Sequence, residues 1–409
     1  MKSKNVRVIG KCVLAAVVAA LMLVGSAQAA DKYEVLHYFE DAAGPYAGLV
    51  ADSAGNLYGT TSSSDHGAGG GTVFKLTRES AGKWSFSVIH EFKGPDGAEP
   101  FSSLIFDSSG NLYGTTDQGG AHNFGTVFEL SPSGSNWKEK LLYSFGDSSD
   151  DVMFPSSALT WDARGNLYGT AVNGGYGNAG GVFELRRVGN QWKERVIDGF
   201  TGNHDGEYPS SSLVADSAGN LYGTATWGGL YNQGVVYELT PSSDGRWTET
   251  VLYNFPGGVL GGNPFSGVIL DAAGNLYGTT VGGGFYTCGN ANCGTVFKLK
   301  RSGGNWSLRV LHSFDGTDGD APFYAGLTFD SAGNLYGTTT AGGQDGYGVV
   351  FKLSQSGNRW TETRLHSFDG KDGANPDGGL ILDQQGRLYG TTTLGGGIQS
   401  FGVVFRITP

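Results

Sequence analysis

The sequence predicts an all-β fold, a seven-bladed β-propeller of four-stranded antiparallel blades. The phrase Gly-Asn-Leu-Tyr-Gly-Thr, or a close variant, occurs seven times at intervals of about 55 residues. Each copy contains four short apolar segments separated by turn residues, and helix signals are absent. The repeated tyrosines are Tyr58, Tyr113, Tyr168, Tyr222, Tyr277, Tyr336 and Tyr389. A repeat of this length with four strands is typical of a propeller blade.

The second copy illustrates the expected strands, at residues 103–107, 111–116, 125–131 and 137–145. An isolated blade of this kind cannot bury both of its faces, whereas blades packed around an axis can. The copy number therefore supports a ring.

The two ends of the chain predict how this ring closes. The seventh repeat holds only three strands before Pro409, and residues 33–39 match the fourth strand of other copies, such as 310–314. We expect residues 31–39 to join the last blade and leave no unpaired inner edge. An open stack of repeats is the alternative, but it predicts capping units that the sequence does not show.

Residues 1–30 have the features of a secretory signal peptide, and the remainder is expected to form one domain. A basic head precedes an apolar run at 12–24, and Ala27-Gln28-Ala29 is a small-x-small cleavage pattern. The apolar run is too short for a membrane anchor. We expect a secreted or periplasmic protein, cleaved near Ala29, without stable membrane insertion. The single propeller domain then covers 31–409, with repeats around 45–92, 100–145, 155–200, 209–255, 264–314, 322–368 and 376–409.

Composition and charge limit both the class of protein and the kinds of partner that we expect. Glycine supplies 71 of 409 residues, but 39% of residues are hydrophobic and recur in register, so the glycines mark turns instead of a disordered linker. The net charge of −11 would become −15 after loss of four basic residues in the signal peptide, which argues against nucleic acid. Only Cys288 and Cys293 follow residue 30, and in an exported chain we expect them to form a disulfide.

Most residues that suggest catalysis have equivalent copies in other repeats, which favours structural roles. The Asp-x-x-Gly-Asn turn recurs, and its aspartate is expected to accept hydrogen bonds from the turn. Six tryptophans open the fourth strands and are expected to pack between blades. Four histidines share one outer-strand position, too far apart to bind one metal, and we expect no cofactor. These residues are Asp52, Asp107, Asp162, Asp216, Asp271, Asp330 and Asp383; Trp84, Trp137, Trp192, Trp247, Trp306 and Trp360; and His37, His90, His312 and His366.

The loops between the second and third strands differ among copies and open on the same face as the blade connections. We predict that this loop face is acidic and the opposite face basic, a surface suited to a glycan, a cation or a basic protein segment. Ordinary solvated loops remain the alternative. The candidate ligand contacts are His122, Phe124, Tyr176, Trp227, Tyr231, Tyr286, Tyr347 and Phe401.

Two hypotheses for function follow. The first is a binding scaffold, expected to be a monomer, that uses the loop face. The second is a hydrolase or lyase acting on a carbohydrate or a lactone, with its site on the acidic loop face or in the central channel. The sequence shows no Gly-x-Ser-x-Gly elbow, no metal-spaced histidine pair and no isolated acid pair that breaks the repeat symmetry. We therefore favour the binding scaffold over the enzyme. A carboxylate pair among the acidic connections is left open, because the sequence does not give the separation of such groups.

The phrases Gly-Asn-Leu-Tyr-Gly-Thr-Thr, Gly-Gly and Gly-Thr-Val-Phe-Lys-Leu resemble the GloVer-type tandem repeat of exported bacterial proteins, whose C-terminal anchor varies among members. The resemblance covers residues 33–409. It implies export and a repeat architecture, and it brings no established activity or catalytic residue. Since the sequence ends on its last strand, we expect release instead of surface attachment.

Overall fold

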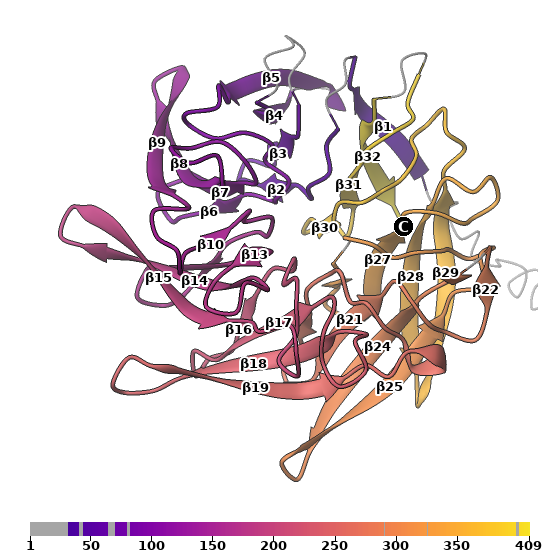
Figure 1. Cartoon of the computed structure of the whole chain (residues 1–409). Coiled ribbons are helices and arrows are strands. Elements are labelled where there is room, and N and C mark those ends of the chain that lie inside the picture. Colours follow the sequence, from indigo (N-terminus) through magenta and orange to yellow (C-terminus); the bar gives the residue numbers. More distant parts are fainter. Residues whose placement is uncertain are drawn as a thin grey trace, which may run out of the picture.

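The computed structural model describes residues 32–40, 44–63, 70–79, 82–289, 291–324, 326–397 and 401–409. The predicted signal peptide at residues 1–30 lies outside them. Seven four-stranded antiparallel sheets surround a central axis, so the fold is the predicted seven-bladed β-propeller (Figure 1). The described residues form no α-helix, only a short 3₁₀ turn at Gly258–Leu260. No helix in these ranges is long and apolar enough to cross a membrane.

The strands follow one another from the axis outward in each blade, as the sheet orders show. Blade 1 contains β2 (Val50–Ala51), β3 (Leu57–Thr61), β4 (Thr72–Arg78) and β5 (Trp84–Glu91). Blade 2 contains β6 (Ile105–Phe106), β7 (Leu112–Thr116), β8 (Thr126–Ser133) and β9 (Asn136–Ser144). Blade 3 contains β11 (Thr160–Trp161), β12 (Leu167–Ala171), β14 (Gly181–Val188) and β15 (Gln191–Gly199). Blade 4 contains β16 (Val214–Ala215), β17 (Leu221–Ala225), β18 (Val235–Pro241) and β19 (Trp247–Asn254).

The remaining blades repeat this order. Blade 5 contains β20 (Ile269–Leu270), β21 (Leu276–Thr280), β24 (Thr295–Ser302) and β25 (Asn305–Ser313). Blade 6 contains β26 (Thr328–Phe329), β27 (Leu335–Thr339), β28 (Val349–Ser356) and β29 (Arg359–Ser367). Blade 7 contains β30 (Ile381–Leu382), β31 (Leu388–Thr392), β32 (Val403–Thr408) and β1 (Lys32–Tyr38). Two small hairpins lie in the loops, β10 (Val152–Met153) with β13 (Asn173–Gly174), and β22 (Thr287–Cys288) with β23 (Ala291–Asn292).

The N-terminal strand occupies the outer position of blade 7. β1 pairs antiparallel with β32, with Lys32 opposite Thr408 and Tyr38 opposite Val403, so the first and last strands lie side by side (Figure 1). The Tyr33 ring also stacks on His366 of blade 6, with 3.9 Å between ring centroids. The predicted pairing of this strand with the last blade is therefore present.

Neighbouring blades are joined by a repeated hydrogen bond near the axis. In each blade one threonine Oγ1 donates to a backbone carbonyl of the next blade, and the threonine of blade 7 donates to blade 1 over 2.9 Å. The pairs are Thr60 to Ser102, Thr115 to Ser157, Thr170 to Ser211, Thr224 to Ser266, Thr279 to Pro322, Thr338 to Pro376 and Thr391 to Ala47. Blade 7 thus contacts blade 1 as every other blade contacts its successor.

The Asp-x-x-Gly-Asn turn has the structural role predicted for it, as blade 3 shows. One carboxylate oxygen of Asp162 accepts from the backbone N–H groups of Arg164 and Asn166, both at 2.8 Å. The other accepts from the Asn166 side chain and from the hydroxyl of Tyr168 at 3.2 Å. The repeated tyrosine therefore holds the turn as well as packing in the core.

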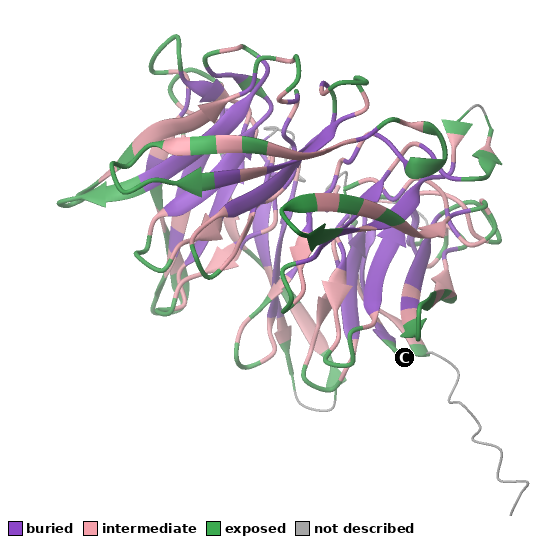
Figure 2. Ribbon diagram, turned by 90° about the horizontal axis from the view of Figure 1, so that it is seen from below, coloured by how far each residue is buried: buried purple, intermediate pink, exposed green. Residues whose placement is uncertain are grey.

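The glycine after that tyrosine makes room for the core. A Cβ atom on Gly169 would lie 2.5 Å from Cζ of Phe183, its partner across the ladder. Phe183 is fully buried. The tryptophans pack between blades as predicted, since Trp247 of blade 4 meets Tyr168 of blade 3 with 5.6 Å between centroids. Buried residues accordingly occupy the second and third strands of each blade, and exposed residues gather at the outer hairpins (Figure 2).

The innermost strands are shorter than predicted. In blade 2 the strand expected at 103–107 is only Ile105–Phe106. The preceding residue Ser102 meets β7 through its side chain instead: its hydroxyl donates to Thr115 O and accepts from Thr115 Oγ1 at 2.8 Å. This contact satisfies polar groups that a longer ladder would have paired, and it frees the backbone at 101–103 to line the central channel.

Candidate functional site

The predicted ligand residues lie on separate loops around the rim. Tyr176, Tyr231, Tyr286 and Tyr347 are exposed by 69, 58, 53 and 45%. They belong to blades 3, 4, 5 and 6, and no contact within the described ranges joins any two of them. The structure therefore does not bring them together as one site.

The other predicted contacts are partly used for packing. Phe124 packs edge-on against Phe154 at 5.6 Å, and Phe401 packs against the core between blades 7 and 1. His122 lies 3.8 Å from an exposed carboxylate of Asp147. Trp227 alone reaches toward the axis, where its ring meets Phe265 at 6.4 Å.

The acidic connections of the loop face also have internal roles. Asp372 pairs with Nε2 of His366 at 2.8 Å and accepts from the backbone N–H of Asp369 at 3.0 Å. Asp151 accepts from the hydroxyl of Tyr143 at 2.9 Å and from the backbone N–H of Gly146 at 2.7 Å. Two further histidines pair in the same way, His90 with Asp96 and His312 with Asp318. These carboxylates shape their own loops, which leaves less of the acidic face for a ligand.

A cavity of about 710 Å³ lies at the central channel. Its lining comes mainly from the segments just before the innermost strands, and none of the eight predicted contacts belongs to it. Its size is in the range of small-molecule sites.

The blades differ within a short motif, Pro-x-x-x-Leu or Pro-x-x-x-Val, that ends each blade connection and leads into the cavity wall. The residue before the proline has positive φ in every blade, 60° at Tyr208 for example, so the chain enters the channel in the same way each time. The residue after the proline varies, as Tyr46, Phe101, Ser156, Ser210, Phe265, Phe323 and Asp377. Blade 6 has one extra residue here, and Tyr324 lines the cavity.

Aromatic rings stand on two parts of the cavity wall. Phe265 of blade 5 stacks on Phe323 of blade 6 with 4.2 Å between centroids, and Tyr324 packs edge-on against Phe265 at 5.8 Å. Tyr46 and Phe101 of blades 1 and 2 form a second pair at 5.3 Å. Blades 3 and 4 place serines at these positions. The cavity therefore offers ring faces on either side of a hydroxyl-bearing wall.

Two carboxyl groups, those of Asp117 and Asp377, lie in the wall of this cavity. Asp117 follows β7, where the other blades carry Ser62, Val172, Thr226, Val281, Thr340 and Thr393. Asp377 replaces the aromatic or serine residue after the proline. Both residues fall outside the repeated phrases and lie 260 positions apart in the sequence, and the ring topology places them in one cavity.

The two carboxyl groups have different surroundings. Asp377 is only 8% exposed and accepts from Thr340 Oγ1 at 2.7 Å and from Thr393 Oγ1 at 3.0 Å. Burial raises the pKa of its carboxyl group. Burial and the nearby charge of Glu99 raise the pKa of Asp117 to about 6. No residue in the described ranges donates a hydrogen bond to the Asp117 carboxyl group.

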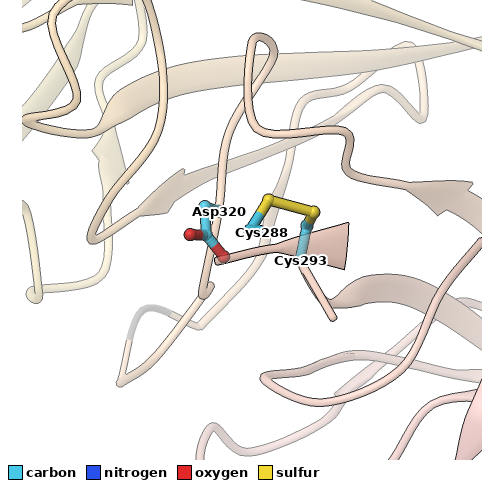
Figure 3. A group of neighbouring side chains, drawn as sticks. All are labelled: Cys288, Cys293 and Asp320. Carbon is cyan, nitrogen blue, oxygen red and sulfur yellow. A yellow bond between two sulfur atoms is a disulfide. The ribbon is translucent and has the colours of Figure 1, made fainter. Parts of the chain in front are cut away.

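The predicted disulfide between Cys288 and Cys293 is present and joins the two strands of the β22–β23 hairpin region. Asp320, from the connection between blades 5 and 6, lies beside it (Figure 3). One ligand atom from each of the three residues falls within a 4.8 Å group. Both sulfur atoms are engaged in the disulfide, however, so neither is a thiolate available to a metal.

The fold is shared with solved structures of low sequence identity. A structure described as an ancestral GH74 enzyme aligns with a TM-score of 0.58 and 11% identity over 88% of this chain. The chain spans 48% of that protein. No curated protein sequence matches the chain.

Two further structures align with lower scores. A putative oxidoreductase (glucose dehydrogenase) from Thermus thermophilus has a TM-score of 0.44 and 17% identity over 76% of this chain and 96% of its own. A protein of unknown function from Dyadobacter fermentans has a TM-score of 0.47 and 10% identity over 93% of this chain and 98% of its own.

A match between the sequence and a family profile identifies the family of this chain. The profile of the Gloeobacter/Verrucomicrobia repeat matches residues 44–291 and 215–409, which together span all seven blades. These matches agree with the resemblance that the repeated phrases indicate. The chain belongs to the Gloeobacter/Verrucomicrobia repeat family.

Proposed function

We propose that this protein is an exported binding propeller whose ligand is a carbohydrate held in the central cavity. The observation that carries the proposal is the aromatic wall formed by Phe265 and Tyr324, with Phe323 stacked behind Phe265, since it breaks the repeat symmetry inside a concave site of about 710 Å³. Aromatic faces in a pocket with a few placed polar groups are typical of small-ligand sites. The residues after the proline differ among blades and most of them line this cavity, so the cavity wall does not follow the repeat symmetry.

The chemistry of the lining suits a sugar. A pyranose ring has an apolar face of C–H groups that can cover an aromatic ring, and hydroxyls at its edge that need hydrogen-bond partners. The serines of blades 3 and 4 provide such partners.

Export is part of the same proposal. The basic and apolar pattern of residues 1–30 supports it, and the Cys288–Cys293 disulfide is compatible with an oxidising compartment. Intact mass and N-terminal sequencing of protein recovered outside the cytoplasm should give a chain that starts next to Ala29 or Ala30. A chain that retains Met1 there would contradict cleavage.

Calorimetric titration tests binding. The panel is cellotriose, xylotriose and the trimer of N-acetylglucosamine, with the parent and two cavity variants, Phe265→Ala and Tyr324→Ala. We expect a panel sugar to bind the parent and each variant to weaken its binding at least about fivefold, because each ring supplies about 1 to 3 kcal/mol of contact.

The matched controls are Tyr176→Ala and Tyr286→Ala, which remove exposed aromatic rings from the rim. They should leave the affinity within about twofold. Loss of binding in the rim variants with full binding in the cavity variants would contradict the proposal and restore the loop face as the site.

A second candidate function is hydrolysis of a glycosidic bond. It is favoured by Asp117 and Asp377 in one cavity, because such reactions use two carboxyl groups and a raised pKa suits the general acid. The GH74 enzyme shares the fold alone, so it adds no weight for particular residues. Release of reducing ends from panel sugars, abolished by Asp377→Asn, would favour this candidate over binding alone.

A further inference from the structure

The charged groups among the described residues that line the cavity are all acidic. Two carboxyl groups line it, and no lysine, arginine or histidine occurs among its described lining residues. Glu99 adds a third negative group next to Asp117. Burial and the neighbouring charges of Tyr208, Asp377, Asp117 and Tyr46 raise the pKa of Tyr324 to about 12. An anionic ligand would enter against this charge without a partner, whereas a cation would be attracted.

Asp117 and Asp377 differ in the hydrogen bonds that their carboxyl groups already accept from the protein. Asp377 already accepts hydrogen bonds on both oxygens, from Thr340 and Thr393. The Asp117 carboxyl group accepts none from the part of the chain that the structure describes. A partly buried carboxylate without a partner gains most from a ligand that brings a donor with positive charge.

We propose that the cavity selects a sugar that carries a free amino group, with Asp117 as the ion-pair partner of the ammonium and aromatic faces beside it. This inference rests on the proposed carbohydrate function and specifies its ligand class. Tyr208 and Tyr324 line the same cavity as Asp117, whose charge also helps to raise the pKa of both tyrosines. Their rings can therefore supply a cation–π contact to the same ammonium. Neutral sugars would keep the stacking contacts and lack the ion pair.

The preference should depend on pH. Asp117 must be ionised to pair with the ammonium, and burial together with Glu99 raises its pKa to about 6. The groups that face it are Glu99, Tyr208 and Tyr324. The two tyrosines have raised pKa values and stay neutral near pH 7. The ion pair is therefore present above about pH 6 for as long as the ligand amine stays protonated, and it is lost as the pH falls and Asp117 takes up a proton.

Three trimers of equal length test this inference in the full chain by calorimetric titration: glucosamine trimer, N-acetylglucosamine trimer and cellotriose, at pH 7 and pH 5. We expect the glucosamine trimer to bind the parent at least tenfold more tightly than cellotriose at pH 7. The ratio should fall below about threefold at pH 5. The acetylated trimer should behave like cellotriose, because acetylation removes the charge and keeps the ring.

The variant Asp117→Asn should reduce the ratio below about threefold at pH 7. Asp117→Ser, which places the residue of blade 1 at this position, is a second variant in case the first one unfolds. The matched control Asp345→Asn removes an exposed carboxylate of a rim loop and should leave the ratio at least tenfold.

The outcomes separate the two proposals. Equal affinity for the amino and neutral trimers at pH 7 would overturn the amine preference and leave the carbohydrate function standing. A preference that survives both Asp117 variants would overturn the role of Asp117. Binding of none of the three trimers would overturn this inference, and failure of the wider neutral panel as well would overturn the carbohydrate function.

Discussion

Glu194 lies at the junction of blades 2 and 3, and it makes the stability of the ring depend on pH. It belongs to β15 and faces Asp151 and Tyr143 of the preceding blade. Its Oε1 atom is buried and has no hydrogen-bond partner among the described residues. Burial, followed by the charge of Asp151, raises the pKa of its carboxyl group from 4.5 to about 8. Equivalent glutamates at other junctions show the same direction, with pKa values of about 7 for Glu139 and about 8 for Glu249.

The change to test is Glu194→Gln, which keeps the shape and cannot ionise. Because the pKa is raised in the folded state, the native protein holds a proton that the unfolded chain releases above about pH 4.5. The stabilising contribution is therefore complete at low pH and is lost as the pH rises through about 8. A pKa raised from 4.5 to about 8 corresponds to at most about 5 kcal/mol, which residual exposure and solvent screening reduce to about 2 kcal/mol.

Thermal unfolding followed by tryptophan fluorescence at pH 5, 7 and 9 measures this effect. We expect similar Tm values for parent and variant at pH 5, and a Tm of the variant higher by a few degrees at pH 9. The control Glu79→Gln removes an exposed carboxylate near the tip of an outer hairpin and should show no such trend. A difference between Glu194→Gln and the parent that is constant from pH 5 to 9 would refute the reasoning.

The remaining predictions concern the ring and the core. Gly169→Ala should lower the unfolding free energy by about 1 to 3 kcal/mol or more, because its Cβ would lie 2.5 Å from the rigid ring of Phe183, and the Tm reports it. Deletion of residues 31–39 should expose β32 as an unpaired edge and promote aggregation, measured by light scattering during size-exclusion chromatography. Reduction of Cys288–Cys293 should cost at most about 2 kcal/mol, because it opens a loop of only a few residues, and should leave the circular dichroism spectrum unchanged.

Each of these predictions has a matched comparison. Gly326→Ala is the control for Gly169→Ala, because a Cβ there meets nothing within 4 Å, and equal losses for the two variants would contradict the packing argument. A deletion variant as stable and monomeric as the parent would refute closure of the ring by β1. Global unfolding on reduction would show that the disulfide supports more than its own loop.

The fold could be predicted because each blade repeats one solution to the same packing problem. The turn aspartates, the tyrosines and the glycines that face phenylalanines recur at fixed spacing, so a single period predicted seven blades and the partner of β1. The shortening of the inner strands could not be predicted, since it depends on side-chain contacts such as Ser102 with Thr115. Strand alternation in the sequence does not distinguish such contacts from a ladder.

The candidate site was harder to predict from the sequence, because the rim loops also vary among the copies and carry aromatic residues. Tyr231 and Tyr286 vary and are exposed, but the rim loops stand apart around the ring. The cavity residues follow a proline in a short connecting segment, where Phe265 and Asp377 look like ordinary variation. The sequence signal for these residues is the variation among the seven copies at the position after that proline. The proximity of Asp117 to this group depends on the ring itself.

The central claim is that the cavity at the axis holds the ligand, and a crystal structure of the protein soaked with the tightest-binding trimer tests it most directly. The claim predicts sugar density stacked on the rings of Phe265 and Tyr324, with an atom of the ligand within hydrogen-bond distance of a cavity serine or of Asp117. Sugar density confined to the rim loops around Tyr176 or Tyr286, with the axial cavity free of ligand, would contradict it.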